Sequence, residues 1–168
     1  SKLDATLEMA DEYVRAKEQK ISSIENMLHS RGVTRMQLYQ IYGQLYDEYF
    51  AFQFDKAKEA VDHQISIADG MRDKGLKDDA MLDKALLLTN AGFFLEASQV
   101  FDALDTLSLD KTQMIGWYNV RQKFLHDYHS FPQHYTINHP VVQGKKFSNR
   151  KRFCKPIRFI RKFFPSPS

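Results

Sequence analysis

The side chains best suited to chemistry lie near the carboxyl end of the chain. His126 and His129 are three residues apart, so on a helix they would share a face, and such a pair can hold a metal ion. No catalytic glutamate accompanies them, and we interpret them as surface histidines at a helix end. Basic neighbours of Cys154 would favour its thiolate, but no general base can be assigned to this cysteine. We interpret it as a residue without a catalytic role.

Neighbouring carboxylates give no stronger indication of catalysis. Asp47–Glu48 and Asp78–Asp79 are adjacent in sequence, so on a helix the two members of a pair point about 100° apart. We interpret them as helix caps and solvated faces. Glycine-rich phosphate loops and a serine elbow are absent from the sequence. We therefore predict a chain that is not an enzyme and that uses no metal ion or cofactor.

Tyrosines at helical spacing are better candidates for a binding site. They recur every three or four residues from Tyr39 to Tyr49, and Gly43 among them allows a close approach of another helix. We interpret most of this stripe as core. The alternative is that part of it faces the concave side of a helical stack, where rigid rings anchor a peptide or a second protein. The candidate binding residues are Arg35, Tyr39, Gln40, Tyr42, Gln44 and Tyr46.

The elements that position these residues are predicted to be helices. Hydrophobic residues at 43% and charged residues at 27% are ordinary globular values, which exclude a disordered or membrane-embedded body. No run approaches the roughly 20 apolar residues that span a bilayer. The single cysteine excludes an internal disulfide and a cysteine-based structural zinc site.

A long amphipathic helix is predicted over the first thirty residues, with Gly32 capping its end. Its apolar face repeats at alternating spacings of four and three residues, interrupted by one lysine. We interpret this helix as packed on the next hairpin of the same chain; the alternative is a coiled-coil segment that forms a homodimer. The stripe consists of Leu3, Leu7, Ala10, Val14, Lys17, Ile21, Ile24 and Leu28.

Five shorter helices follow in the prediction, the fourth of them carrying Ala97, Leu104 and Leu107. The last contains Trp117 and Phe124, and no partner helix is visible after Tyr128. The expected boundaries are a capping box at Thr34 and Gln37, a turn near Phe52–Asp55, a stop at Gly75, a cap at Asp78 or Asp79, a break at Gly92 and a cap at Ser108 or Asp110.

One pattern occurs twice, 40 residues apart. Ala51–Val61 aligns without gaps with Ala91–Phe101. A recurrence at this period indicates stacked helical hairpins, neither of which can bury its apolar face alone. Alanine at the helix crossing permits a close approach, and phenylalanine fills the wedge between hairpins. The predicted packing residues are Phe54, Ala57, Val61, Gly92, Phe94, Ala97 and Phe101.

The stretch NAGFFLEASQVFDAL, residues 90–104, resembles the second half of a tetratricopeptide repeat. In that repeat a small residue ends the first helix, an aromatic follows the turn, and alanine lies at the crossing. The first copy departs from it, because Phe52 replaces the turn glycine and Gln64 replaces a small or apolar residue. The 40-residue spacing also exceeds the usual period of about 34, which predicts longer helices or an irregular stack.

A narrower resemblance covers roughly residues 1–128. It rests on two stretches, LDATLEMADEYVRAKEQKI and YQIYGQLYDEYFAFQFDKAKEAV. Both look like the amino-terminal half of a bacterial family of uncharacterised proteins described as transcriptional regulators. In those proteins helical repeats precede a membrane span and a helix-turn-helix. The resemblance implies a sensory part on the periplasmic side of a membrane-anchored protein; a cytoplasmic location is the alternative. Neither the span nor the helix-turn-helix is in this sequence, so DNA binding by such a module is not carried over.

Charge divides the chain sharply. Residues 1–127 hold all 21 Asp and Glu with 15 Lys and Arg, a net charge of −6, whereas residues 128–168 hold nine Lys and Arg and no acid, a net charge of +9. Three interpretations stay open: a binder of nucleic acid or an anionic membrane through residues 145–164, a solvated extension, or a segment not native to the domain. The first basic residues of this tail are Lys145, Lys146, Arg150, Lys151 and Arg152.

We therefore predict an all-α fold in which antiparallel helical hairpins stack as a short tetratricopeptide-like superhelix. The expected parts are an amino-terminal helix packed on the repeats over residues 1–32, the repeats over 33–128, and a basic, Pro-containing tail over 129–168. The predicted function is non-catalytic binding of a peptide or protein as the sensory part of a regulator. Binding of nucleic acid or an anionic membrane surface through the tail is the alternative.

Overall fold

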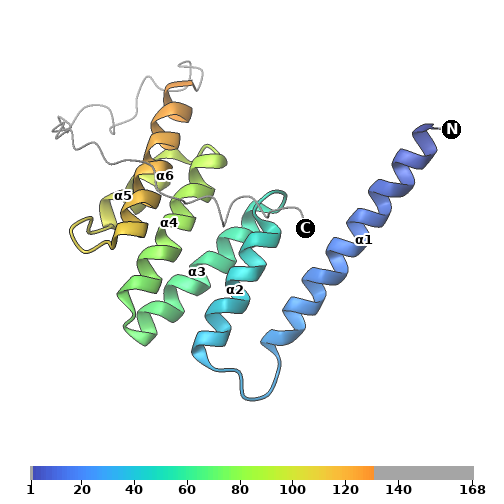
Figure 1. Cartoon of the computed structure of the whole chain (residues 1–168), viewed down its shortest axis with the longest axis horizontal. Coiled ribbons are helices and arrows are strands. Elements are labelled where there is room, and N and C mark those ends of the chain that lie inside the picture. The colour runs from blue at the N-terminus through green and yellow to red at the C-terminus, as the bar shows by residue number, and fades with distance from the viewer. Residues whose placement is uncertain (1, 131–168) are drawn as a thin grey trace.

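The computed structural model describes residues 2–130, and this part of the chain is built of helices without a strand. Each helix folds back beside the one before it, so the helices form a row (Figure 1). The all-α class and the antiparallel hairpins are thereby confirmed. The helices are α1 (Lys2–Leu28), α2 (Arg35–Tyr49), α3 (Phe54–Met71), α4 (Lys74–Asn90), α5 (Phe94–Ala103) and α6 (Lys111–Ser130).

Local side-chain hydrogen bonds begin α2 and α6. The Thr34 hydroxyl accepts from the Gln37 amide at 3.1 Å, and the Thr34 amide donates to Gln37 Oε1 at 2.8 Å, which is the predicted capping box. At α6, Asp110 and Gln113 exchange the equivalent pair of bonds at 2.8 and 3.1 Å. Asp110, one of the two residues expected to cap the last helix, therefore does so. These bonds satisfy amides that would otherwise lack a partner in the first turn.

The boundary between α3 and α4 differs from the prediction. Arg72 takes the left-handed conformation, with φ 57°, and ends α3 three residues before Gly75. The carboxylate of Asp73 accepts from the Leu76 amide at 3.0 Å and caps α4, so Gly75 lies within that helix. The expected stop at Gly75 and the expected cap at Asp78 or Asp79 are therefore wrong. A non-glycine residue in the left-handed conformation carries little sequence signal.

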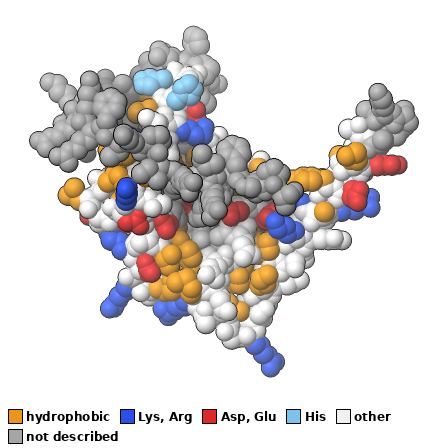
Figure 2. All heavy atoms as spheres, in the orientation of Figure 1, with side chains coloured by type: hydrophobic (Ala, Val, Ile, Leu, Met, Phe, Trp, Pro, Cys, Tyr) orange, Lys and Arg blue, Asp and Glu red, His pale blue; other side chains and the backbone are white. Residues whose placement is uncertain are grey.

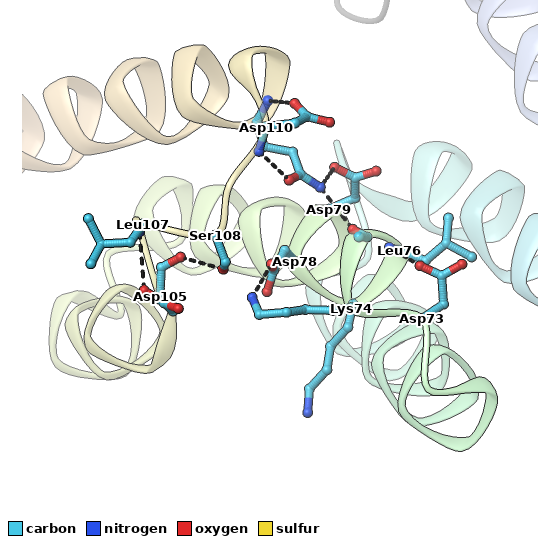
Figure 3. Close-up of polar contacts among 12 residues, drawn as sticks. Asp73, Lys74, Leu76, Asp78, Asp79, Asp105, Leu107, Ser108 and Asp110 are labelled. Atoms are coloured by element: carbon cyan, nitrogen blue, oxygen red, sulfur yellow. Dashed lines mark hydrogen bonds and ion pairs between the residues drawn. The ribbon is translucent and has the colours of Figure 1, made fainter.

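The helix α5 is shorter than expected. It ends at Ala103, and Leu107 lies in the following turn with 96% of its surface exposed. There Asp105 Oδ1 accepts from the Leu107 amide at 3.1 Å and the Asp105 carbonyl accepts from the Ser108 hydroxyl at 2.8 Å, as Figure 3 shows. Such short-range bonds from aspartate and serine compete with the helix and end it. The long α3 and α4, of 18 and 17 residues, account for the 40-residue spacing of the repeat.

Two clusters of buried side chains form the core, and α4 contributes to both. One cluster joins α1, α2 and α3 to Ala80 and Leu87 of α4. The other joins α5 and α6 to Ala85, Leu86 and Leu88 of α4. Phe54 packs against both clusters, so it lies where neighbouring hairpins meet. The central helix α4 therefore ties the two halves of the described part together.

Only the carboxyl-terminal half of α1 packs on the repeats. Ile21 and Ile24 are buried, Lys20 Nζ lies 2.6 Å from a carboxylate oxygen of Glu48, and the Tyr49 hydroxyl donates to Glu25 at 2.7 Å. The other half of α1 extends away from the row of helices (Figure 1). The carboxyl-terminal half of this helix therefore packs on the following hairpin, and the amino-terminal half projects away from it.

Candidate binding surface

The first helices of the successive hairpins, α2, α4 and α6, are held together by side-chain hydrogen bonds to α4. The hydroxyls of Tyr39 and Tyr46 in α2 donate to the carbonyls of Leu76 and Asp83, at 2.9 and 2.8 Å. From α6, Gln113 Nε2 donates to the carbonyl of Gly75 and to a carboxylate oxygen of Asp79, both at 2.9 Å. The bond to Asp79 appears beside Asp110 in Figure 3. These bonds give α2, α4 and α6 a fixed arrangement.

Carboxylates gather around the bonds between α2 and α4. Burial raises the pKa of Tyr39, and the charges of Asp79, Asp83 and Asp73 raise it further. Burial also raises the pKa of Tyr46, with a further contribution from Asp83. Both hydroxyls therefore stay protonated and keep donating through the physiological pH range. These bonds therefore hold α2 and α4 together throughout this range of pH.

The structure separates the six candidate binding residues into two groups. Tyr46 is 5% exposed and its hydroxyl is bonded to α4, so it is a packing residue. Tyr39 is half-buried, and Tyr42 is half-buried with its ring stacked on His63 at 4.4 Å. The three polar candidates are exposed: Arg35, Gln40 and Gln44. The tyrosine stripe thus serves mainly to attach α2, whereas the polar residues face solvent.

A polar stripe along α2 is therefore the surface available to a partner. Gln40 and Gln44 are four residues apart and share a helix face with Met36, which is 42% exposed. Arg35 begins the same helix, and its guanidinium donates to the Gly70 carbonyl of α3 at 3.1 Å. We call Arg35, Met36, Gln40 and Gln44 the α2 stripe. Met36 is not among the residues predicted from the sequence, although its spacing of four from Gln40 indicates the same helix face.

The residues of the repeated pattern lie at the helix crossings. Ala57, Val61 and Ala97 have no exposed surface, and Phe101 is 5% exposed. Phe94 contacts Phe124 edge-on, with ring centroids 5.7 Å apart. Gly92 has φ 78°, a conformation that glycine adopts without strain, and it ends the turn after α4. Together these residues hold α3 and α5 against the helices before and after them.

Gly43 marks another close approach, between α2 and α3. A side chain at this position would bring its Cβ within 2.8 Å of Gln64 Nε2. Gln64 is 5% exposed and donates to the Tyr39 carbonyl at 3.1 Å. The glutamine that departs from the repeat pattern thus bonds the backbone of α2. A Cβ at position 43 would displace this amide, so the contact favours a glycine opposite.

One carboxylate pair behaves differently from the prediction. Asp78 is 5% exposed and accepts from Lys74 Nζ at 2.5 Å, as Figure 3 shows, so it is neither a cap nor a solvated residue. Its neighbour Asp79 is half-buried and bonded to Gln113. Asp47 is exposed as expected, whereas Glu48 is half-buried beside Lys20.

The residues first considered for chemistry do not form a centre within residues 2–130. His126 and His129 are exposed near the end of α6. In this part of the chain, no three His, Cys, Asp or Glu side chains lie close enough together to hold a metal ion. Cys154 and the basic residues from Lys145 to Arg152 lie outside the described residues.

A shallow hollow of about 570 Å³ lies along α3. Its lining residues are of polar or charged types, and all of them belong to one helix rather than to several walls. Ligand pockets are typically concave and mostly apolar, with a few polar groups. The hollow is therefore a feature of the charged surface of α3. Its lining residues are Asp55, Lys58, Glu59, Asp62, His63 and Ser66.

Comparison with known proteins gives one family. The model of the SusR N-terminal TPR domain, where TPR denotes the tetratricopeptide repeat, matches residues 7–150. The match begins in α1 and continues past the end of α6 into residues 131–150, beyond the extent of roughly 1–128 expected from the sequence. No curated protein and no solved structure matches the chain. None of the helices in residues 2–130 is long and apolar enough to cross a membrane. Because the match covers most of the chain and the helices form antiparallel hairpins, the chain belongs to the SusR N-terminal TPR domain family.

Proposed function

We propose that this chain is a non-catalytic module that binds a peptide or another protein along the α2 stripe. The observation that carries the proposal is the exposed polar face of a helix whose opposite side is fixed by buried tyrosines. A partner that binds such a face does not have to order the helix first, so little of the interaction energy is lost. Membership of a helical-repeat family supports the same class of function.

The chemistry of the stripe indicates the kind of peptide. Gln40 and Gln44 each offer an amide donor and acceptor four residues apart, and Met36 supplies an adaptable apolar contact. The net charge of −6 over residues 1–127 favours a peptide that carries positive charge. Electrostatic complementarity of this kind contributes to the association rate and to specificity.

We further propose that binding serves a sensory role within a longer regulator. The supporting observations are the resemblance to repeats that precede a membrane span and the match to an amino-terminal domain. In this proposal the module lies on the periplasmic side of the membrane, and a cytoplasmic location is the alternative. Expression of the full-length parent protein with a protease-sensitive tag beside the repeats tests the location. Cleavage in intact spheroplasts supports the periplasmic side, and protection contradicts it.

The binding proposal is tested by selecting peptides on the 168-residue chain and measuring their affinity by calorimetry. The double variant Gln40→Ala/Gln44→Ala should raise the dissociation constant about tenfold, because each lost hydrogen bond contributes roughly 0.5–1.5 kcal/mol. Gln99→Ala/Gln122→Ala, which alters exposed glutamines on α5 and α6, is the matched control and should leave the affinity unchanged. Equal weakening by both pairs would contradict binding at the α2 stripe.

A second candidate function rests on the charge of the tail. The net charge of +9 over residues 128–168 favours contact with nucleic acid or an anionic membrane surface. Deleting residues 151–168 removes six of the nine basic residues and keeps the whole of the matched region. If the tail binds, the deletion abolishes binding to single-stranded DNA or to phosphatidylserine vesicles, and the affinity of the intact chain falls steeply with salt. Affinity independent of the deletion would contradict this function.

A further inference from the structure

The apolar stripe of α1 changes from buried to exposed halfway along the helix. Ile21 and Ile24 are 9% and 5% exposed against α2, whereas Val14 is 51% exposed. Met9 and Tyr13, beside Val14, are 71% and 68% exposed. Figure 2 shows hydrophobic side chains along the projecting part of α1. Within the described part of the chain, α2 covers the stripe only from Ile21 onward.

A partner would stabilise this half of α1. A helical segment of about 15 residues is only marginally stable alone in water. The sequence keeps its spacing of four and three residues from Val14 back to Leu3. This spacing is typical of helices that pack along a seam on another helix. The seam therefore continues beyond α2 and is suited to a second helix.

We propose that this half of α1 packs against the same half of α1 in a second copy of the chain. The seam is continuous with the α1–α2 interface, where Ile21 and Ile24 already pack on a helix. Most soluble homo-oligomers are two-fold symmetric dimers that use one surface patch twice. Apolar residues occupy positions spaced four and three residues apart, so this surface of one copy can pack against the same surface of the other. This self-association is independent of peptide binding at the α2 stripe.

The position of α2 determines the direction of the pairing. From Ile21 onward the seam is covered by α2, so a parallel partner would meet α2 in both copies. An antiparallel partner instead overlaps only the exposed halves and leaves the two rows of repeats at opposite ends. Ala10, which is exposed and small, lets the two backbones approach each other.

Charges along α1 bear on where the contact is centred. Asp11 and Glu18 follow Leu7 and Val14 by four residues and form an acidic row on one border of the stripe. Met9 and Tyr13 lie on the other border. An interface centred toward Tyr13 keeps the acidic rows of the two copies apart, where water screens them. We therefore place Ala10 at the centre of the contact, with Tyr13 and Val14 one helical turn away from it.

Sedimentation equilibrium of the 168-residue chain tests the proposal over a wide range of concentration. The expected result is a mass that rises from 19.7 kDa toward twice this value. Val14→Glu should hold the mass at the monomer value, because it places a carboxylate in the seam. Gln19→Glu adds the same charge on the far side of α1 and should still dimerise. Neither variant should change the melting temperature of the monomer, which shows that both fold.

A disulfide test distinguishes the two directions of pairing. In a Cys154→Ser background, Val14→Cys would form a disulfide across a parallel pair, where the two positions meet at the axis. In the antiparallel pair the two positions lie on opposite sides of the centre and do not cross-link. A monomeric wild-type chain, a Val14→Glu dimer or an oxidised Val14→Cys dimer would each overturn the proposal.

Discussion

At the scale of single residues, small side chains set how closely the helices approach. Ala57 and Ala97 have no exposed surface at the helix crossings, and Gly43 faces Gln64 with no room for a Cβ. Polar side chains connect residues that are far apart in the sequence. The Tyr46 hydroxyl, for example, donates to the carbonyl of Asp83, which lies 37 positions later. The function of the α2 stripe depends on both, because they hold the opposite side of the helix in place.

A larger residue at the second crossing should destabilise the fold. Ala97→Leu overpacks the contact between α4 and α5, and we expect a loss of about 1–3 kcal/mol in the free energy of unfolding. Urea denaturation followed by circular dichroism measures it. Ala103→Leu adds the same volume at an exposed position of α5 and is the control. A loss as large in Ala103→Leu would show that the crossing is not the cause.

Asp62 makes part of the stability depend on pH. Burial acts to raise its pKa, but hydrogen bonds and charges from Lys58 and Lys84 outweigh burial and lower the pKa below its usual 3.8. A lowered pKa in the folded state gives a contribution that is complete above the unfolded value and disappears as the pH falls through the folded value. The stability difference between the wild type and Asp62→Asn should therefore be constant near neutrality and shrink below about pH 4.

Urea titrations from neutral to acidic pH measure this difference. Glu12→Gln, at an exposed position of α1, is the control for the loss of a carboxylate. High salt should reduce the Asp62 contribution as well, because the ion pairs are partly open to solvent. A difference that grew as the pH fell would show that Lys58 and Lys84 do not stabilise the carboxylate.

At the scale of elements, α2, α4 and α6 begin where side chains satisfy free backbone amides, and turns of two to seven residues separate the helices. The boxes at Thr34 and Asp110 could be read directly from the sequence, because both partners lie within three residues. The end of α3 could not, because Arg72 takes a conformation usually adopted by glycine or asparagine.

Removing the cap of α2 should weaken this helix. Thr34→Ala deletes the hydroxyl that accepts from the Gln37 amide, and caps of this kind contribute about 1 kcal/mol. We expect a lower melting temperature and faster amide exchange in the first turn of α2. Ser66→Ala, an exposed hydroxyl within α3, should have a much smaller effect. Unchanged exchange at Arg35 to Gln37 would contradict a stabilising role of the box.

At the scale of the whole molecule, α4 supports both parts of the core. Its Leu87 is 2% exposed and packs with α2 and α3, while Leu86 and Leu88 pack with α5 and α6. In a repeat array, stability is nearly a sum of neighbouring contacts, so a shared helix joins the two parts into one cooperative unit.

A cavity at Leu87 should therefore affect both ends of the described part. Leu87→Ala is expected to cost roughly 2–5 kcal/mol, and hydrogen exchange should speed up in α6 as well as in α2. Leu95→Ala, at a 37% exposed site in α5, is the control. Faster exchange confined to α2 and α3 would show that the two core clusters unfold separately.

The sequence by itself determined the helical class, the repeated hairpins and the capping boxes, because these depend on residues three or four positions apart or on one pattern that occurs twice. Only the tertiary structure decided that Tyr46 is covered, that Asp78 is a buried ion-pair partner and that half of α1 is exposed. Each of these depends on which helix lies alongside, and that contact joins residues far apart in the chain. The exposure of Arg35, Gln40 and Gln44, on which the proposed binding rests, follows from the same packing.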